Sequence, residues 1–405
     1  MTILKQASLL MYPSGYKSGK IYSILPKDGS GDLTFTRAST ATRVNESGLI
    51  ETVAIDTPRI DYTGGGCGSL LLESQRTNTV LSNSDYTASW SLTNVIPTAN
   101  VTISPNGSND AQKLTSANTF GQHYIRQILG GHTVGAPHVY SCFAKAAELD
   151  ILTLRLLNGG SPNVNFDLTN GTHDGGANGK MIDFGNGWWR CITYHPSAAS
   201  QYLYPYIYTQ VGNQQGDGVS GFYVYGAMLE EGTVETSLID TTTTTVTRTR
   251  DTSITTGLSS VINSVEGAIF VEMAALANDS TNRYISINNG TSAKRIILKF
   301  GTSSNNISAL GLGTANSFNM SYSGATITNM NKIALKYKAN DCALWVNGVE
   351  VATDTTFTAY AASTLSHIAF SNFSGGGQWL EANVQSVAVY NTALSDADLT
   401  TLTTL

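Results

Sequence analysis

Apolar and polar residues alternate along most of this chain in short runs, which are bounded by Gly, Asn, Asp or Pro. An alternation with a period of two residues is typical of a strand with one buried face, because successive side chains point to opposite faces. The residues between the runs supply the backbone conformations that tight turns require. The pattern therefore predicts an all-β protein.

Residues 81–240 contain a regular series of such runs, beginning near Trp90. The clearest are HVYSCFAKA, LTLRLLN, NVNFDL, GWWRCITYH, YLYPYIYT and SGFYVYGAMLE. Several short strands at regular spacing indicate a β-sandwich or jelly roll. We expect one sandwich here.

Residues 252–405 show the same pattern and predict a second sandwich. Within it, Asn347–Gly348 lies between alternating apolar residues and favours a two-residue type I′ hairpin turn. Trp345, in the run before that turn, is expected in the core. Ser395 stands ahead of Asp396 and Asp398, a pattern typical of a helix N-cap followed by an acidic first turn.

Two segments lack a clear core of their own. Residues 1–80 are rich in turns and are expected to form an attachment and oligomerisation module; the alternative is a simple cap on the next domain. Residues 241–251, which begin with Thr241–Thr245, read as a Thr-rich linker or as an edge strand between domains. The expected fold is thus a turn-rich N-terminal module followed by two β-sandwich domains.

Composition narrows the range of partners. The chain has 405 residues, enough for two or three domains, and only 13% of them are charged. A net charge of −6 argues against nucleic-acid binding, which needs a basic surface. No apolar run has transmembrane length, and residues 1–24 do not follow the order of a signal peptide. The four cysteines are scattered, so buried free thiols are expected: Cys67, Cys142, Cys191 and Cys342.

The stretch FTRASTATRVNESGLIETVAIDTPRIDY at residues 35–62, followed by LLLESQRTN at residues 70–78, resembles a segment that recurs in fibre, spike and head-decoration proteins of tailed bacteriophages. The resemblance continues at residues 225–251, YGAMLEEGTVETSLIDTTTTTVTRTRD. In motif order, residues 81–240 are similar to jelly-roll carbohydrate-binding modules. Residues 252–405 are similar to concanavalin A-like (laminin-G-like) sandwiches.

This resemblance implies a structural virion protein that is made in the host cytoplasm and displayed on the virion surface. It implies a homotrimer attached to other virion proteins through residues 1–80. It also implies lectin-like domains that adhere to cell-surface or mucus glycans.

Catalysis is not expected. The chain has no GxSxG motif, and its six histidines show no zinc-type pairing; His132 and His138 flank a Gly-Ala-Pro turn and read as loop residues. A glycan depolymerase, the alternative function, would need two carboxylates a fixed distance apart. Sequence proximity offers only Glu230–Glu231, Glu266 with Glu272, and Asp396 with Asp398.

Aromatic residues are the candidate glycan-binding groups, because sugar rings stack on aromatic rings. In YLYPYIY, the period of a strand places Tyr202, Tyr204, Tyr206 and Tyr208 on one face. The alternative is that this row fills a sandwich core or a subunit interface. Trp188 and Trp189 point to opposite faces, which makes Trp189 a further candidate, and Trp379 follows the glycine-rich loop SNFSGGGQ.

No cofactor is expected. A structural calcium ion is possible at the Asp217 turn or at the loop of Asn278, Asp279 and Asn282, which offer oxygen ligands. Neither place has enough carboxylates to define a site, and the resemblance to calcium-holding sandwich families is the main support.

Overall fold

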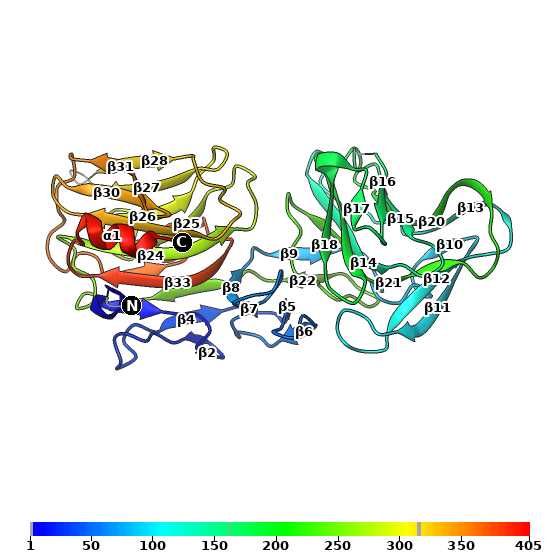
Figure 1. The fold of residues 1–405 in the computed structure, drawn as a ribbon, viewed down its shortest axis with the longest axis horizontal. Coiled ribbons are helices and arrows are strands. Elements are labelled where there is room, and N and C mark those ends of the chain that lie inside the picture. The colour runs from blue at the N-terminus through cyan, green and yellow to red at the C-terminus, as the bar shows by residue number, and fades with distance from the viewer. Residues whose placement is uncertain (1–2, 161, 314–316) are drawn as a thin grey trace.

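The protein is described by a computed structural model that covers residues 3–160, 162–313 and 317–405. The chain forms two β-sandwich lobes that lie side by side (Figure 1). One lobe contains the middle of the chain and the other contains both of its ends. The all-β fold expected from the alternation is confirmed.

The middle lobe consists of two six-stranded sheets. The first has the order β10 (Ser91–Thr93), β13 (Phe120–Arg126), β20 (Tyr204–Gln215), β15 (Ile151–Leu157), β16 (Val164–Asp167) and β17 (Thr172–His173). The second has the order β11 (Val95–Thr102), β12 (Ala111–Ser116), β21 (Gly221–Glu231), β14 (His138–Lys145), β19 (Trp188–His195) and β18 (Gly179–Asp183), with the short 3₁₀ helix η2 (Gly176–Asn178) before β18. Fully buried side chains such as Leu154, Ile207 and Phe222 form its core. This lobe matches the sandwich expected at residues 81–240.

The terminal lobe also has two sheets. One has the order β31 (Val349–Asp354), β30 (Cys342–Val346), β29 (Asn331–Tyr337), β24 (Gly267–Ala275), β33 (Ala382–Tyr390), β8 (Ser69–Leu72) and β7 (Ile60–Asp61), and β1 (Leu9–Met11) also pairs with β33. The other has the order β2 (Tyr16–Lys17), β3 (Lys20–Ile21), β4 (Leu33–Thr36), β23 (Thr252–Thr255), β32 (His367–Ala369), β25 (Arg283–Asn288), β26 (Arg295–Phe300), β27 (Ile307–Leu312) and β28 (Phe318–Tyr322).

Most of residues 3–75 is built into this lobe, which differs from the separate module expected at residues 1–80. Leu9 pairs with Val389, Leu70 pairs with Val384, and Phe35 pairs with Ser253. The physical reason is that the short apolar strands β1 and β8 complete the edge of β33 and bury their side chains in the shared core. The terminal sandwich is therefore not confined to residues 252–405.

Two antiparallel connections join the lobes. The chain leaves the terminal lobe through β9 (Arg76–Asn78) and returns through β22 (Val246–Arg248), and these two strands pair with each other. The hairpin of β5 (Ala41–Val44) and β6 (Ile50–Val53) lies beside them (Figure 1). Thr241–Thr245 is neither an edge strand nor fully detached: Thr241 is buried, and its hydroxyl donates to the carbonyl of Val80 at 2.6 Å.

Two local expectations in the terminal lobe are confirmed. Asn347 and Gly348 have φ angles of 50° and 87°, as a type I′ turn requires. Ser395 caps helix α1 (Asp396–Thr403), because its hydroxyl accepts from the Asp398 amide at 3.2 Å. The helix packs on the outer side of the first sheet, where Trp345 is buried. A short 3₁₀ helix, η1 (Ile3–Gln6), lies at the start of the described chain.

Three of the four cysteines are buried free thiols, as expected, whereas Cys67 is exposed. Within the described residues, no helix has the length and apolar character needed to cross a membrane.

Candidate functional site

Strand β20 carries the tyrosines that the sequence analysis singled out. Ile207 lies in the core of the middle lobe. Tyr204, Tyr206 and Tyr208 alternate with it and stand on the outer face of the sheet, and Tyr202 precedes the strand. The tyrosine row therefore does not belong to the core of the sandwich.

The strand register places an arginine on each side of Tyr206. Arg126 on β13 and Arg155 on β15 are both its direct cross-strand neighbours. Each guanidinium carbon lies 5.6 Å from the centre of the Tyr206 ring, within the range of a cation–π contact. Arg126 also donates to the Tyr206 hydroxyl at 2.8 Å, and Arg155 donates to that of Tyr208 at 3.4 Å.

The rings form a compact cluster. Tyr206 and Tyr208 stack with their centres 5.5 Å apart, and Tyr124 packs against them at 5.1 and 5.2 Å. This packing leaves Tyr206 only 6% exposed and Tyr208 5% exposed, whereas Tyr202 is 49% exposed. We call this surface the aromatic–arginine face; its members are Tyr124, Arg126, Arg155, Tyr202, Tyr204, Tyr206 and Tyr208.

The chemistry of this face is that of a recognition surface. No carboxylate of the described residues forms an ion pair with Arg126 or Arg155. Their remaining N–H groups are free to donate to hydroxyl or carboxylate oxygens of a ligand. Tyr202 and the half-buried Tyr204 supply the accessible ring surface.

The two tryptophan candidates are half-buried. Trp379 lies half-buried beside the loop of residues 371–378, and Arg250 covers its ring at 5.1 Å. Trp189 packs against the core of the middle lobe and donates its indole N–H to the carbonyl of Leu168 at 3.0 Å. Its neighbour Trp188 is buried on the other face, as the alternation predicted.

A buried ionic network lies where the lobes meet, and we call it the junction network. Its members come from residues 35–78 and 225–251 of the sequence: Arg37, Arg59, Glu73, Arg248 and Asp251. Glu73 pairs with Arg59 at 2.6 Å and with Arg248 at 2.7 Å. Asp251 pairs with Arg37 at 3.2 Å and also contacts Arg59. These two segments therefore contribute to the contact between the lobes.

The network holds Glu73 in its charged form. Burial acts to raise the pKa of Glu73, but Arg248, Arg59 and the bonds from Ser237 outweigh burial and lower the pKa to about 2. The amide and hydroxyl of Ser237 both donate to this carboxylate at 2.7 Å. A carboxylate bound in this way is a structural anion and is not available as an acid or base.

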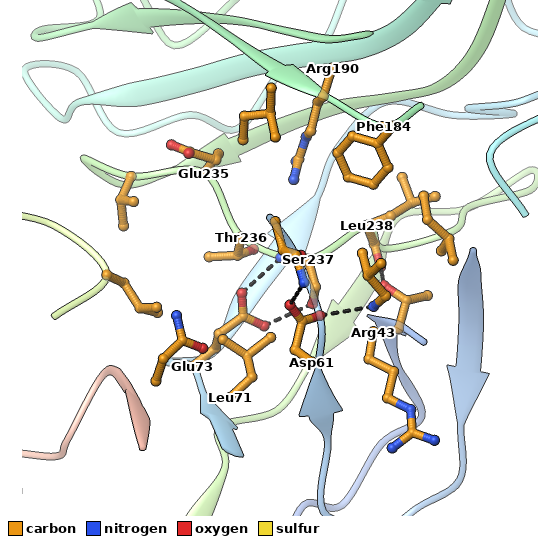
Figure 2. Close-up of a pocket in the computed structure, with 18 of the residues that line it drawn as sticks. Arg43, Asp61, Leu71, Glu73, Phe184, Arg190, Glu235, Thr236, Ser237 and Leu238 are labelled. Carbon is orange, nitrogen blue, oxygen red and sulfur yellow. Dashed lines mark hydrogen bonds between the residues drawn. The ribbon is translucent and has the colours of Figure 1, made fainter. Parts of the chain in front are cut away.

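A cavity of about 370 Å³ opens beside the network, and we call it the junction cavity (Figure 2). Both lobes line it; the residues used below are Asp61, Thr63, Glu73, Phe184, Arg190 and Glu235. Asp61 accepts from the backbone amides of Val44 and Thr63 at 2.8 and 2.9 Å. Glu235 accepts from Lys180 and from the Tyr194 hydroxyl, each at 2.6 Å.

Five of the six carboxylates considered for catalysis contact a hydrogen-bond donor or a lysine. Glu230 is buried and accepts from the amide and hydroxyl of Thr236 at 2.9 and 2.7 Å, while Glu231 is exposed at the end of β21. Glu272 accepts from Ser386, and Glu266 lies 3.6 Å from Lys338. In the third pair, Asp398 takes part in the helix cap, and Asp396 contacts Lys336 at 3.1 Å.

The calcium candidates do not fit a metal site. The Asp217 carboxylate accepts from the amides of Val219 and Ser220 at 2.9 and 2.7 Å. Asp279 pairs with Arg283 at 2.8 Å and accepts from Thr233. Among the described residues, no group of three or more His, Cys, Asp or Glu side chains is arranged to hold an ion.

Sequence reasoning missed the arginines and misplaced one histidine. Arg126 and Arg155 are 29 positions apart and meet at Tyr206 only through the strand register. His132 lies in a loop, as expected, whereas His138 begins strand β14; both are buried, and their ring nitrogens lie 3.1 Å apart. The alternating pattern at residues 124–126 was the one available signal for Arg126.

Comparisons with known proteins give only weak likenesses. No family model matches the sequence, and no curated protein matches it. Among solved structures, the CBM40 domain of the Ruminococcus gnavus IT-sialidase bound to alpha2,3 sialyllactose is 18% identical; the match covers 36% of this chain and 91% of that one, with a TM-score of 0.32.

Two further structures are similar to the same degree. Domain 4 of AbnA, a GH43 extracellular arabinanase from Geobacillus stearothermophilus in complex with arabinotriose, is 12% identical over 38% of this chain and 73% of that one, with a TM-score of 0.32. The leech intramolecular trans-sialidase is 18% identical over 35% of this chain and 23% of that one, with a TM-score of 0.29. Likenesses this weak do not identify a ligand.

Proposed function

We propose that this chain is a structural protein of a bacteriophage virion, a fibre, spike or head-decoration protein, which adheres to glycans through the aromatic–arginine face. The observation that carries the proposal is the pair of arginines on either side of Tyr206, with no carboxylate partner among the described residues. A cationic, aromatic patch on the outer face of a sandwich sheet offers these free donors to a ligand or partner.

A sugar suits this surface for two reasons. Its apolar ring face stacks on an aromatic side chain such as Tyr202 or Tyr204, and its hydroxyls accept from Arg126 and Arg155. Such a contact is weak, because most of the hydroxyls are already well hydrated, and a millimolar dissociation constant corresponds to about −4 kcal/mol. Many copies on one particle, each a homotrimer, convert weak contacts into avidity.

The virion-surface part of the proposal rests on the resemblance of residues 35–78 and 225–251 to phage proteins. Attachment to other virion proteins is assigned to residues 1–80. In this region the large apolar side chains of Tyr12, Tyr22 and Ile24 are 36%, 38% and 50% exposed. We assign the attachment contact to these exposed apolar side chains.

The test measures binding of the full chain to a panel of bacterial surface polysaccharides, together with its position on the particle by cryo-electron microscopy. Tyr204→Ala and Arg155→Gln should each weaken glycan binding and leave the melting temperature within a few degrees. A matched control is Tyr322→Ala, because Tyr322 is a half-buried tyrosine of the other lobe. Unchanged binding in both variants would remove the assigned site, and release of reducing sugar would favour a depolymerase instead.

A further inference from the structure

Arg190 is the unusual member of the junction cavity. It is 5% exposed, and its Nε atom is buried without a hydrogen-bond partner among the described residues. Its Nη2 atom donates to the Ser141 hydroxyl at 3.2 Å, and its guanidinium lies over the ring of Phe143 at 5.5 Å. In Figure 2 the side chain extends from the middle lobe into the space between the lobes.

No described carboxylate lies within 4 Å of this guanidinium, although Glu230 and Glu235 interact with it at longer range. Glu230 is bonded to Thr236, and Glu235 is bonded to Lys180 and Tyr194. A buried cation without a close partner is costly, because the lost hydration is not replaced. A ligand carboxylate beside Arg190 would offset part of this cost.

The other walls complete a small-molecule site. Phe184 stands beside Arg190 in Figure 2, and Asp61 lies on the opposite side of the cavity. Asp61 and Glu235 use only some of the lone pairs of their carboxylates, so they still accept from ligand hydroxyls. A volume of about 370 Å³ falls in the range of small-molecule sites, about 300–1,000 Å³. Thr63 and Lys180 are exposed, so the rim of the cavity reaches solvent.

We propose that the junction cavity binds a small hydroxylated carboxylic acid, of the size of one uronic acid unit. Its carboxylate pairs with Arg190 through two parallel N–H donors, the geometry that a guanidinium favours. Its ring lies against Phe184, and its hydroxyls donate to Asp61 and Glu235. A dianion such as phosphate suits the cavity less, because it would approach the carboxylates of Asp61, Glu73 and Glu235.

The site is separate from the aromatic–arginine face. Its walls come from both lobes and from the segment that connects them, including Asp61, Arg190 and Glu235. A bound ligand would therefore bridge the lobes, and its binding free energy would add to the stability of their junction.

Isothermal titration of the full chain with sodium D-glucuronate, glucose and inorganic phosphate tests the proposal. We expect saturable binding of glucuronate at millimolar concentration or below, and at least tenfold weaker binding of glucose and phosphate. Arg190→Gln should weaken glucuronate binding at least tenfold. Because this change removes an unpaired buried cation, the melting temperature without ligand should stay the same or rise.

Two further variants make the result decisive. Thr63→Trp at the exposed rim should block the cavity without altering Arg190, which keeps the test valid if Arg190→Gln fails to fold. Lys338→Gln, which removes a half-exposed cation outside the lining of the cavity, should leave glucuronate binding unchanged. The proposal would be overturned if glucuronate did not bind, or if it still bound to both cavity variants. If only Arg155→Gln lost glucuronate binding, the ligand would lie on the aromatic–arginine face, which would also overturn the proposal. Equal binding of phosphate through Arg190 would overturn the assigned ligand class.

Discussion

Arg59 donates to Glu73 at 2.6 Å in the buried junction between the two lobes. Both side chains are almost completely excluded from solvent, and Arg248 shares the same carboxylate oxygen. Burial acts to lower the pKa of the Arg59 guanidinium, but Asp251 and Glu73 outweigh it and raise that pKa. The pair is one element of a network in which each charge has a partner of opposite sign.

Removing one charged member of this network should lower the free energy of unfolding strongly. Glu73→Gln leaves Arg248 without an ion-pair partner among the described residues and leaves Asp251 to balance both Arg37 and Arg59. Breaking a buried pair in this way typically costs about 3–5 kcal/mol. We expect a free energy of unfolding reduced by that amount, measured by denaturant titration at pH 7. The control is Glu266→Gln. Glu266 lies 3.6 Å from Lys338, which is half exposed, so this change should lower the free energy of unfolding by less than about 1 kcal/mol. Equal losses in the two variants would contradict this account of the junction.

Three buried histidines should make the protein sensitive to mild acid. Burial, and then the nearby His138, lower the pKa of His132 and of His195 to about 4, and burial also lowers the pKa of His138. In the unfolded chain these groups have a pKa near 6.5. Between about pH 6.5 and 4 the unfolded state therefore binds protons that the folded state does not, and stability falls as the pH falls.

The measurement is the free energy of unfolding at pH 7.5, 5.5 and 4.5, compared with that of His195→Gln. The glutamine variant should lose less stability across this range, by about 1–2 kcal/mol after allowance for solvent screening. Glu231, which favours the charged form of His132 and His138, moderates the effect in both proteins. Identical pH profiles for the two proteins would show that the pKa of His195 is the same in the folded and unfolded states.

The two lobes should differ when they are expressed alone. Residues 79–241 contain every strand of the middle lobe, so this fragment should melt cooperatively. Residues 252–405 lack β1, β4 and β8, whose partners are β33 and β23, and should aggregate through the edges that remain unpaired. Circular dichroism and light scattering decide this, and a soluble, cooperative fragment 252–405 would contradict the shared core.

Trp379 provides a test of which lobe contacts glycan. Trp379→Ala removes a half-buried ring and its contact with Arg250, which should cost about 1–2 kcal/mol of stability. Glycan binding should be unchanged, because the aromatic–arginine face lies on the other lobe. Loss of adhesion in this variant with Tyr204→Ala unaffected would move the site to the terminal lobe.

The sequence determined the features that depend on near neighbours in the chain. Strand alternation revealed the all-β class and placed the tyrosines on one face of a strand, Asn347–Gly348 revealed a hairpin, and Ser395 revealed a helix cap. Each is set by the backbone preferences of a few adjacent residues, so a short window of sequence contains the necessary information.

Only the tertiary structure decided which distant segments meet. Strand β1 pairs with β33 across almost the whole chain, Arg126 and Arg155 reach Tyr206 through the register, and Arg190 enters a cavity lined by both lobes. The sequence of a strand does not by itself specify the partner strand, because the backbone groups at any free strand edge can satisfy its hydrogen bonds. The pairing is chosen by burial of the whole core, and the positions of the arginines follow from that choice.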